Sequence, residues 1–140
     1  MPAVYIVDDD DEDCDLVMKA FAKSNIPCRI RLFSNGLDLF RTLEHTSPPE
    51  FPSFILLDLN MPIMNGFETL EKLRADSRYR TIPVLVLSSS SYPDDIVQSY
   101  DLGGNAYLRK PHSFRTLVEM INLTSQYWLR SARTPIHRLN

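Results

Sequence analysis

Short apolar runs alternate five times with longer amphipathic stretches along this 140-residue chain, which limits the fold more than any other feature. Three of the runs are almost continuously apolar, as is typical of parallel strands covered on both faces. The predicted strands are Val4–Val7, Cys28–Phe33, Phe54–Leu57, Val84–Leu87 and Ala106–Leu108. The predicted helices are Glu12–Ser24, Gly36–Glu44, Gly66–Arg74, Tyr92–Leu102 and Ser113–Ser131. The alternation predicts the α/β class, with a doubly wound parallel sheet and right-handed crossovers.

Length and composition favour one globular domain. With 44% hydrophobic and 24% charged residues, the chain can bury a core without disulfides, so we assign residues 1–131 to one domain and 132–140 to a tail. Cys14 and Cys28 lack the spacing of metal ligands, which favours free thiols in a cytoplasmic protein. Neither an export signal nor a membrane span is indicated. The net charge of −3 argues against a surface for nucleic acid.

Three segments carry further local signals. Ser91 followed by Asp94 predicts a capping box at the fourth helix. Residues 46–52 predict a rigid surface loop, in preference to a recognition motif, at the edge of the sheet away from the ligand site. The last helix has a predicted buried face that comprises Phe114, Leu117, Val118, Ile121 and Trp128. Beside it lies a second apolar line, Met120, Leu123 and Tyr127, which is either a set of scattered surface residues or a dimer or partner surface that includes the Trp128 region.

Polar side chains follow four of the predicted strands at their carboxyl ends. Asp8 and Asp9 follow the first strand, Asp58 the third and Ser88 the fourth, and Lys110 lies two residues after the fifth. The carboxyl ends of parallel strands meet at one edge of the sheet, where such folds bind ligands. We therefore expect three carboxylates, a hydroxyl and an ammonium group to converge there.

Such a set of charges indicates a metal-assisted phosphoryl site. Three close carboxylates repel one another, and Mg²⁺ is the hard cation that best suits two or three of them with water and a carbonyl. A carboxylate beside Mg²⁺ and Lys110 can act as the nucleophile that forms an aspartyl phosphate. Each part alone has a simpler interpretation. For example, the acids at positions 10–13 favour the start of a helix through its dipole.

Four motifs at these positions resemble those of response regulator receiver domains. They are Ile6-Val7-Asp8-Asp9, Leu56 to Pro62 with Asn65-Gly66, Val84 to Ser89, and Tyr107-Leu108-Arg109-Lys110-Pro111. The resemblance runs from about residue 4 to about residue 128 and implies a CheY-like (βα)5 fold with strand order 2-1-3-4-5. Residues 96–102 and 126–129 resemble, more narrowly, the small single-domain regulators associated with bacterial phytochromes.

The resemblance implies a role for each acid of the cluster. Asp58 would be the phosphoacceptor. Mg²⁺ would be the cofactor, bound by Asp9 directly, by Asp8 mainly through water, by Asp58, and by the backbone carbonyl of Asn60. The protein would therefore be a signalling switch and not an enzyme with a turnover reaction.

Further residues are implied to respond to the phosphoryl group. Lys110 would pair with it and would be presented through a cis peptide before Pro111. Ser88 would be the switch hydroxyl that moves toward the phosphoryl group, and Tyr107 the aromatic residue that turns inward with it. Ser90, two positions after Ser88, departs from the acidic or bulky residue that is common there.

The resemblance also implies a histidine kinase or a phosphotransfer protein as the phosphodonor. The surface of the fourth helix, the fifth strand and the fifth helix would change on phosphorylation and bind a partner, which includes the possibility of a homodimer. Neither nucleic acid nor a membrane is expected as a partner.

Three other functions fit parts of the pattern. A dehalogenase-like phosphatase would need a second acid two residues after the nucleophile, where this chain has Asn60. A flavodoxin-like cofactor binder would need a hydroxyl- and glycine-rich loop after the first strand, where this chain has consecutive aspartates. A calcium loop over residues 8–13 would need a central glycine and a distal glutamate.

Overall fold

A parallel sheet of five strands runs through the middle of the computed structural model, which describes residues 1–135. The strands are β1 (Ala3–Val7), β2 (Arg29–Phe33), β3 (Phe54–Leu57), β4 (Val84–Ser88) and β5 (Ala106–Arg109). They pair in the order β2-β1-β3-β4-β5. The predicted fold class and strand order are confirmed.

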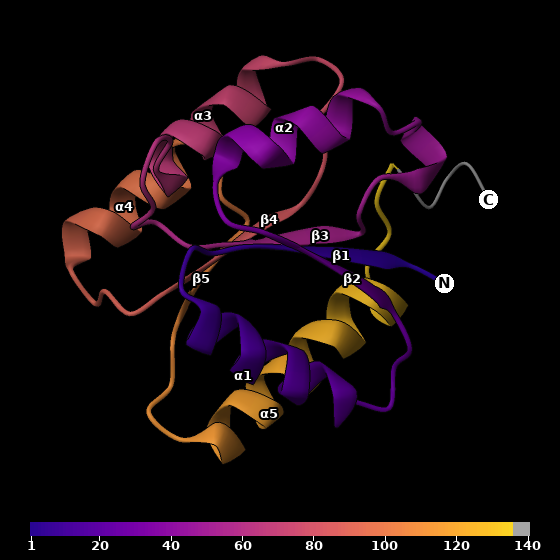
Figure 1. The fold of residues 1–140 in the computed structure, drawn as a ribbon, viewed down its shortest axis with the longest axis vertical. Coiled ribbons are helices and arrows are strands. Elements are labelled where there is room, and N and C mark those ends of the chain that lie inside the picture. The colour runs from indigo at the N-terminus through magenta and orange to yellow at the C-terminus, as the bar shows by residue number, and fades with distance from the viewer. Residues whose placement is uncertain (136–140) are drawn as a thin grey trace.

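Helices cover both faces of this sheet. They are α1 (Asp11–Ala22), α2 (Gly36–Glu44), α3 (Gly66–Ala75), α4 (Pro93–Asp101) and α5 (Phe114–Ser125), with a short 3-10 turn η1 (Pro48–Glu50) and a π-helical turn η2 (Gln126–Ser131). Figure 1 shows α1 and α5 packed together on one face, and α2 and α3 on the other. Each of α1, α3 and α4 follows a strand of the sheet, so these helices begin near the edge where the carboxyl ends of the strands lie.

Burial follows the alternation of side chains along each strand. In β1, Val4 and Ile6 join the cluster under α1 and α5, while Tyr5 and Val7 join the cluster under α2 and α3. Strands β1, β3 and β4 are buried throughout, whereas the edge strand β2 is largely exposed. Each large side chain fully buried in this way contributes about 1.5–3 kcal/mol to folding.

The start of α4 differs from the prediction. Its N-cap is Tyr92, which makes no side-chain cap hydrogen bond in the described structure, so the predicted capping box of Ser91 and Asp94 is wrong. Pro93 occupies the first helical position, where its fixed φ favours the helix and where it has no N–H of its own that would need a partner. A reciprocal capping box occurs instead at α3, between Asn65 and Glu68.

The last helix continues from α5 into η2 and so covers the predicted range up to Ser131. Its predicted buried face is confirmed, because Leu117 and Ile121 are buried and the other three residues pack partly against the same core. The predicted division between residues 131 and 132 stays a prediction, and residues 136–140 of the tail lie outside the described part. None of the described helices is long and apolar enough to cross a bilayer.

Candidate functional site

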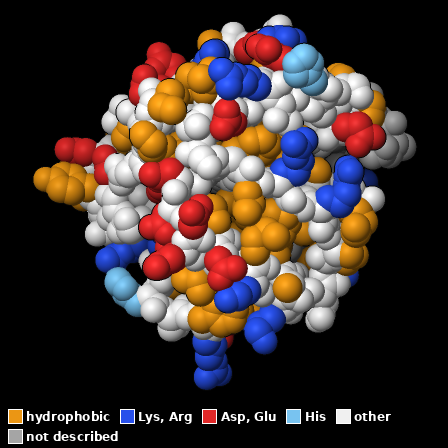
Figure 2. Space-filling view, in the orientation of Figure 1, with side chains coloured by type: hydrophobic (Ala, Val, Ile, Leu, Met, Phe, Trp, Pro, Cys, Tyr) orange, Lys and Arg blue, Asp and Glu red, His pale blue; other side chains and the backbone are white. Residues whose placement is uncertain are grey.

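Three carboxylates meet at the carboxyl ends of β1 and β3. Asp8, Asp9 and Asp58 each offer an oxygen, and these oxygens all lie within 4.8 Å of one another. Asp8 and Asp58 are buried, while Asp9 is exposed at the mouth of the site. Figure 2 shows acidic side chains gathered on the left of the molecule, where β1 ends and α1 begins in Figure 1. The predicted convergence of the three acids is present in the structure.

The ammonium group of Lys110 lies among these acids. Its Nζ is 2.9 Å from Asp8 Oδ2, 2.7 Å from Asp13 Oδ2 and 3.7 Å from Asp58 Oδ1. Burial lowers the pKa of Lys110, but hydrogen bonds to Asp13 and Asp8 outweigh burial and hold the pKa above its usual value. Lys110 therefore stays charged and offsets part of the repulsion between the carboxylates.

The loop after β3 lies against the backbone of Asp58. A Cβ at Gly66 would meet the carbonyl oxygen of Asp58, so only glycine allows this close approach, and Gly66 N–H donates to Leu59 O at 2.9 Å. Within the same loop Ile63 has a φ of 69°, a left-handed conformation that is strained for a β-branched residue. Asn60 is exposed in this loop, next to the acid cluster in sequence.

The environment of Asp58 favours its neutral form. Burial raises the pKa of Asp58 to about 6, and the charge of Asp8 adds to this effect while Lys110 opposes it. The carboxylate oxygens lie close enough together to bind one ion, and the partly buried Lys110 balances only part of their charge. Such a set of oxygen ligands could hold a hard divalent cation.

This raised pKa predicts that Asp58→Asn stabilises the metal-free protein. The folded pKa of about 6 exceeds the ordinary 3.8, so the stability that Asp58 contributes is full below about pH 4 and is lost as the pH rises through 6. At pH 7 we expect the variant to be more stable by about 1–3 kcal/mol, at about 1.4 kcal/mol per pKa unit. Urea unfolding in a chelator at pH 5 and pH 7 measures the difference.

The exposed Asp101→Asn is the control for that prediction, and its stability should change by less than about 0.5 kcal/mol. Saturating Mg²⁺ should narrow the difference between Asp58→Asn and the wild type. Equal stabilities of Asp58→Asn and the wild type in chelator at pH 7 would contradict the raised pKa of Asp58.

A second group of polar contacts links β4, β5 and the start of α4. Ser88 is fully buried at the end of β4, and its Oγ accepts a hydrogen bond from Ser90 N–H at 3.1 Å. The Tyr107 hydroxyl donates to the carbonyl oxygen of Ser90 at 2.8 Å. Ser90 Oγ donates to Asp95 and accepts from Tyr92 N–H. Ser90 therefore connects the two predicted switch residues, a link that the sequence did not indicate.

Two features near the site differ from expectation. Asp13, which was grouped with the acids at the start of a helix, also binds Lys110, and no signal in the local sequence indicated this contact. Among residues 1–135 no peptide bond is cis, so the cis peptide implied before Pro111 is absent; both isomers of such a bond lie close in energy. Cys14 and Cys28 are free thiols, as predicted.

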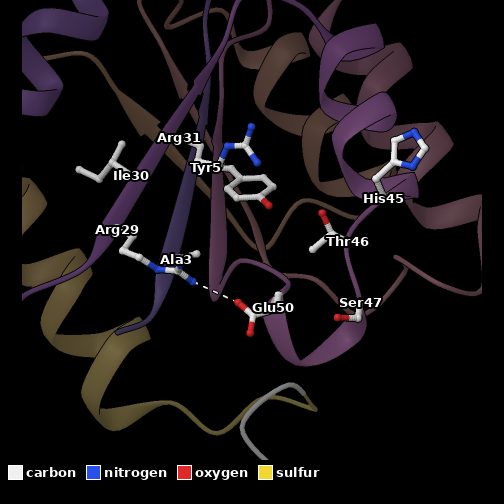
Figure 3. Close-up of a pocket in the computed structure, with 9 residues that line it drawn as sticks. All are labelled: Ala3, Tyr5, Arg29, Ile30, Arg31, His45, Thr46, Ser47 and Glu50. Atoms are coloured by element: carbon white, nitrogen blue, oxygen red, sulfur yellow. Dashed lines mark hydrogen bonds and ion pairs between the residues drawn. The ribbon is translucent and has the colours of Figure 1, made fainter.

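A separate hollow of about 500 Å³ lies at the other end of β1 and β2. Figure 3 shows Arg29 paired with Glu50 at this hollow, with Thr46 and Ser47 from the loop after α2 on another side. The loop of residues 46–52 is thus at the edge of the sheet away from the acids, as predicted. Its Arg29–Glu50 pair is exposed, so this hollow lacks the buried charges that distinguish the acid cluster.

The sequence of residues 4–122 matches the family model of the response regulator receiver domain. The chain belongs to this family. Among curated proteins, the receiver domain is 34% identical over 135 residues to the probable methanogenesis regulatory protein FilR2 of Methanothrix harundinacea, covering 94% of this chain and 86% of FilR2. It is 32% identical over 136 residues to the response regulator Rcp1 of Synechocystis, covering 94% and 92%.

Solved structures agree with this assignment. The phosphorylated cyanobacterial phytochrome response regulator RcpA superposes with a TM-score of 0.87 at 32% identity, covering 96% of this chain and 98% of RcpA. The Mn²⁺-bound form of Rcp1 superposes with a TM-score of 0.84 at 30% identity, covering 96% and 99%. The predicted resemblance to phytochrome-associated regulators is confirmed. This receiver domain is thus a two-component signalling domain of a family that interacts with histidine kinases or phosphotransfer proteins.

Proposed function

We propose that this receiver domain accepts a phosphoryl group on Asp58 in the presence of Mg²⁺. The observation that carries the proposal is the placement of a partly buried lysine 3.7 Å from Asp58 and beside three carboxylates within 4.8 Å of one another. The similar proteins Rcp1 and RcpA, solved with Mn²⁺ and in phosphorylated form respectively, support both parts of it.

In this proposal the chain supplies the protein ligands of the metal and the charge that pairs with the phosphoryl group, and water completes the coordination of Mg²⁺, also between the ion and Asp8. Asp8, Asp9, Asp58 and the carbonyl oxygen of Asn60 would hold Mg²⁺, which offsets the negative charge on the entering phosphoryl group. A carboxylate oxygen of Asp58 attacks phosphorus, and the bond from phosphorus to the donor's leaving group breaks. Lys110 then pairs with a phosphoryl oxygen, which stabilises the product.

The contacts of Ser90 support a switch between two states. If the Ser88 hydroxyl turns toward a phosphoryl group on Asp58, it must give up the hydrogen bond from Ser90 N–H. Movement of Ser90 then disturbs the carbonyl oxygen that holds the Tyr107 hydroxyl. Ser88 and Tyr107 would thus change together, and α4 would respond through the bond from Ser90 to Asp95.

Tyr107→Phe should weaken the resting state, since it removes the hydrogen bond to Ser90. We expect a loss of about 0.5–1.5 kcal/mol in the free energy of unfolding. Tyr92→Phe is the matched control, because Tyr92 is 67% exposed. Urea unfolding of both variants without phosphodonor measures the effect, and equal losses in the two variants would count against the resting hydrogen bond.

Exposed apolar residues on the two helical parts support a partner surface over α4, β5 and α5. They are Tyr92 at the N-cap of α4, Val97 and Tyr100 in α4, Leu123 in α5, and Tyr127 in η2, which continues α5. Met120 and Trp128, which the sequence placed in or beside such a surface, pack partly against the core instead. We propose that this surface binds a partner when Asp58 is phosphorylated, with a second copy of the chain as one such partner.

Sedimentation tests the homodimer. We expect an increase in molar mass when beryllofluoride, a mimic of the phosphoryl group, and Mg²⁺ are added, and Leu123→Glu should prevent the increase because it places a charge on an exposed apolar position. A single monomeric species under both conditions would rule out the homodimer and leave other proteins as the partners.

The proposed phosphodonor is a histidine kinase or a phosphotransfer protein. The similarity to a phytochrome response regulator and to a regulator in red light signalling of R. palustris favours a photoreceptor-linked kinase. The cytoplasmic location predicted from the sequence stays a prediction.

Phosphoryl transfer itself is tested with acetyl phosphate. We expect the intact mass of the wild type to increase by one phosphoryl group only when Mg²⁺ is present. Hydroxylamine should release the phosphoryl group as phosphate, because it attacks the acyl carbon of an acyl phosphate, and should leave the smaller mass increase of a hydroxamate on the protein. No increase, or an increase that survives both hydroxylamine and removal of Mg²⁺, would contradict the proposed function.

A further inference from the structure

Asp13 makes the shortest contact of the Lys110 ammonium group. The distance from Nζ is 2.7 Å to Asp13, compared with 2.9 Å to Asp8 and 3.7 Å to Asp58. The Lys110 side chain is 16% exposed and that of Asp13 is 34% exposed, so the pair is only partly screened by water. In this state Lys110 is held mainly by two acids that are not the proposed phosphoacceptor.

The start of α1 holds Asp13 in this position. Asp10 is the N-cap residue, and its Oδ1 accepts the hydrogen bond from Asp13 N–H at 3.0 Å. Asp10 O also accepts from Cys14 N–H at 3.0 Å, which closes the first turn of the helix. The carboxylate of Asp13 is therefore carried by an ordered helical turn, and less conformational entropy is lost when it binds Lys110.

Asp13 stands apart from the acids that could hold a metal ion. The cluster of carboxylates within 4.8 Å of one another comprises Asp8, Asp9 and Asp58. A cation bound there would compete with Lys110 for Asp8 but would leave Asp13 as its partner. Asp13 can thus retain Lys110 when the metal is bound, until a stronger anion draws the ammonium group away.

A phosphoryl group on Asp58 is such an anion. It carries a charge of about −1.5 to −2 and three acceptor oxygens, so Lys110 gains by moving toward it. To make that contact, the ammonium group must lengthen or give up its bond to Asp13. The bond present in the resting state therefore opposes the contact that defines the phosphorylated state.

We propose that Asp13 is a positioning residue that retains Lys110 in the resting state and thereby opposes its transfer to the phosphoryl group. The inference rests on the proposed phosphorylation of Asp58. The first turn of α1 would thus take part in regulation, because its Asp13 pairs with Lys110 in the resting state and loses this partner on phosphorylation.

The test measures the affinity for beryllofluoride at saturating Mg²⁺, followed by fluorine NMR. Asp13→Asn should bind about three- to tenfold more tightly than the wild type, as expected for loss of one competing charge-assisted hydrogen bond. Asp13→Glu, which restores the carboxylate, should return toward the wild-type value. Asp11→Asn is the matched control, because it removes a charge from an exposed position in the same helical turn and should leave the affinity within about twofold.

The outcomes separate this inference from the proposed function. If the wild type binds beryllofluoride and Asp13→Asn binds it equally or more weakly, the retaining role of Asp13 is overturned and the phosphorylation of Asp58 stands. Tighter binding in both Asp13→Asn and Asp11→Asn would show a general charge effect and would also overturn it. If the wild type itself binds no beryllofluoride, the proposed function fails and this inference fails with it.

Discussion

Asp58→Asn should accept no phosphoryl group from acetyl phosphate, even with saturating Mg²⁺ and long incubation. The amide of asparagine lacks the anionic oxygen that attacks phosphorus, so the acyl phosphate cannot form. Asp8 and Asp9 do not replace it, because in the proposed site they are needed to hold the metal and Asp8 is hydrogen-bonded to Lys110. Intact-mass measurement over time, with peptide mapping of the product, shows both the loss and the position of the label.

Asp11→Asn is the control for that experiment and should be labelled at the wild-type rate. The stability of Asp58→Asn should be equal to or above that of the wild type, so misfolding would not explain a lost label. If Asp58→Asn were labelled to the wild-type level, a residue other than Asp58 would be the phosphoacceptor.

Lys110→Ala should have the second large effect, on both phosphorylation and stability. Loss of a single preorganised charge that stabilises a developing anion costs about 100- to 1,000-fold in rate, and we expect phosphoryl acceptance to slow to that extent. Without metal, the variant leaves Asp8 and Asp58 buried without their cation. Breaking a buried ion pair in this way costs about 3–5 kcal/mol, which we expect as the upper bound of the loss in unfolding free energy.

Mg²⁺ should restore much of that stability but little of the rate. The metal can neutralise the carboxylates, whereas it cannot take the place of Lys110 at the phosphoryl oxygen. Lys19→Ala is the control, since Lys19 forms an exposed pair with Asp15 on α1 and should change both quantities only slightly. If Lys110→Ala were phosphorylated at the wild-type rate, Lys110 would have no part in the transfer.

The acid cluster is the part of the site that local sequence patterns predict well. Asp8, Asp9 and Asp58 come directly after apolar runs, and the carboxyl ends of parallel strands share one edge of the sheet. The position of each acid in the sequence therefore determines its position in the fold. The same reasoning placed Lys110 at this edge, because it follows β5.

Contacts between segments far apart in the chain could not be predicted in this way. Asp13 and Lys110 are separated by 97 positions, and their bond depends on how the first turn of α1 faces the end of β5. The link from Tyr107 to Ser90 depends likewise on the packing of β5 beside β4. A motif gives the residue type at each place, but the partner of a side chain follows from rotamers and packing that the whole fold sets.

The amino-acid sequence by itself determined the alternating α/β topology and the edge at which the acids gather, because strand period and residue order are local properties of the chain. The tertiary structure alone decided which partners Lys110 has and how Ser90 joins Ser88 to Tyr107. It also decided the burial of Asp58, which raises the pKa of that residue to about 6. These depend on distances of a few ångströms between elements, and electrostatic and hydrogen-bond energies change steeply over such distances.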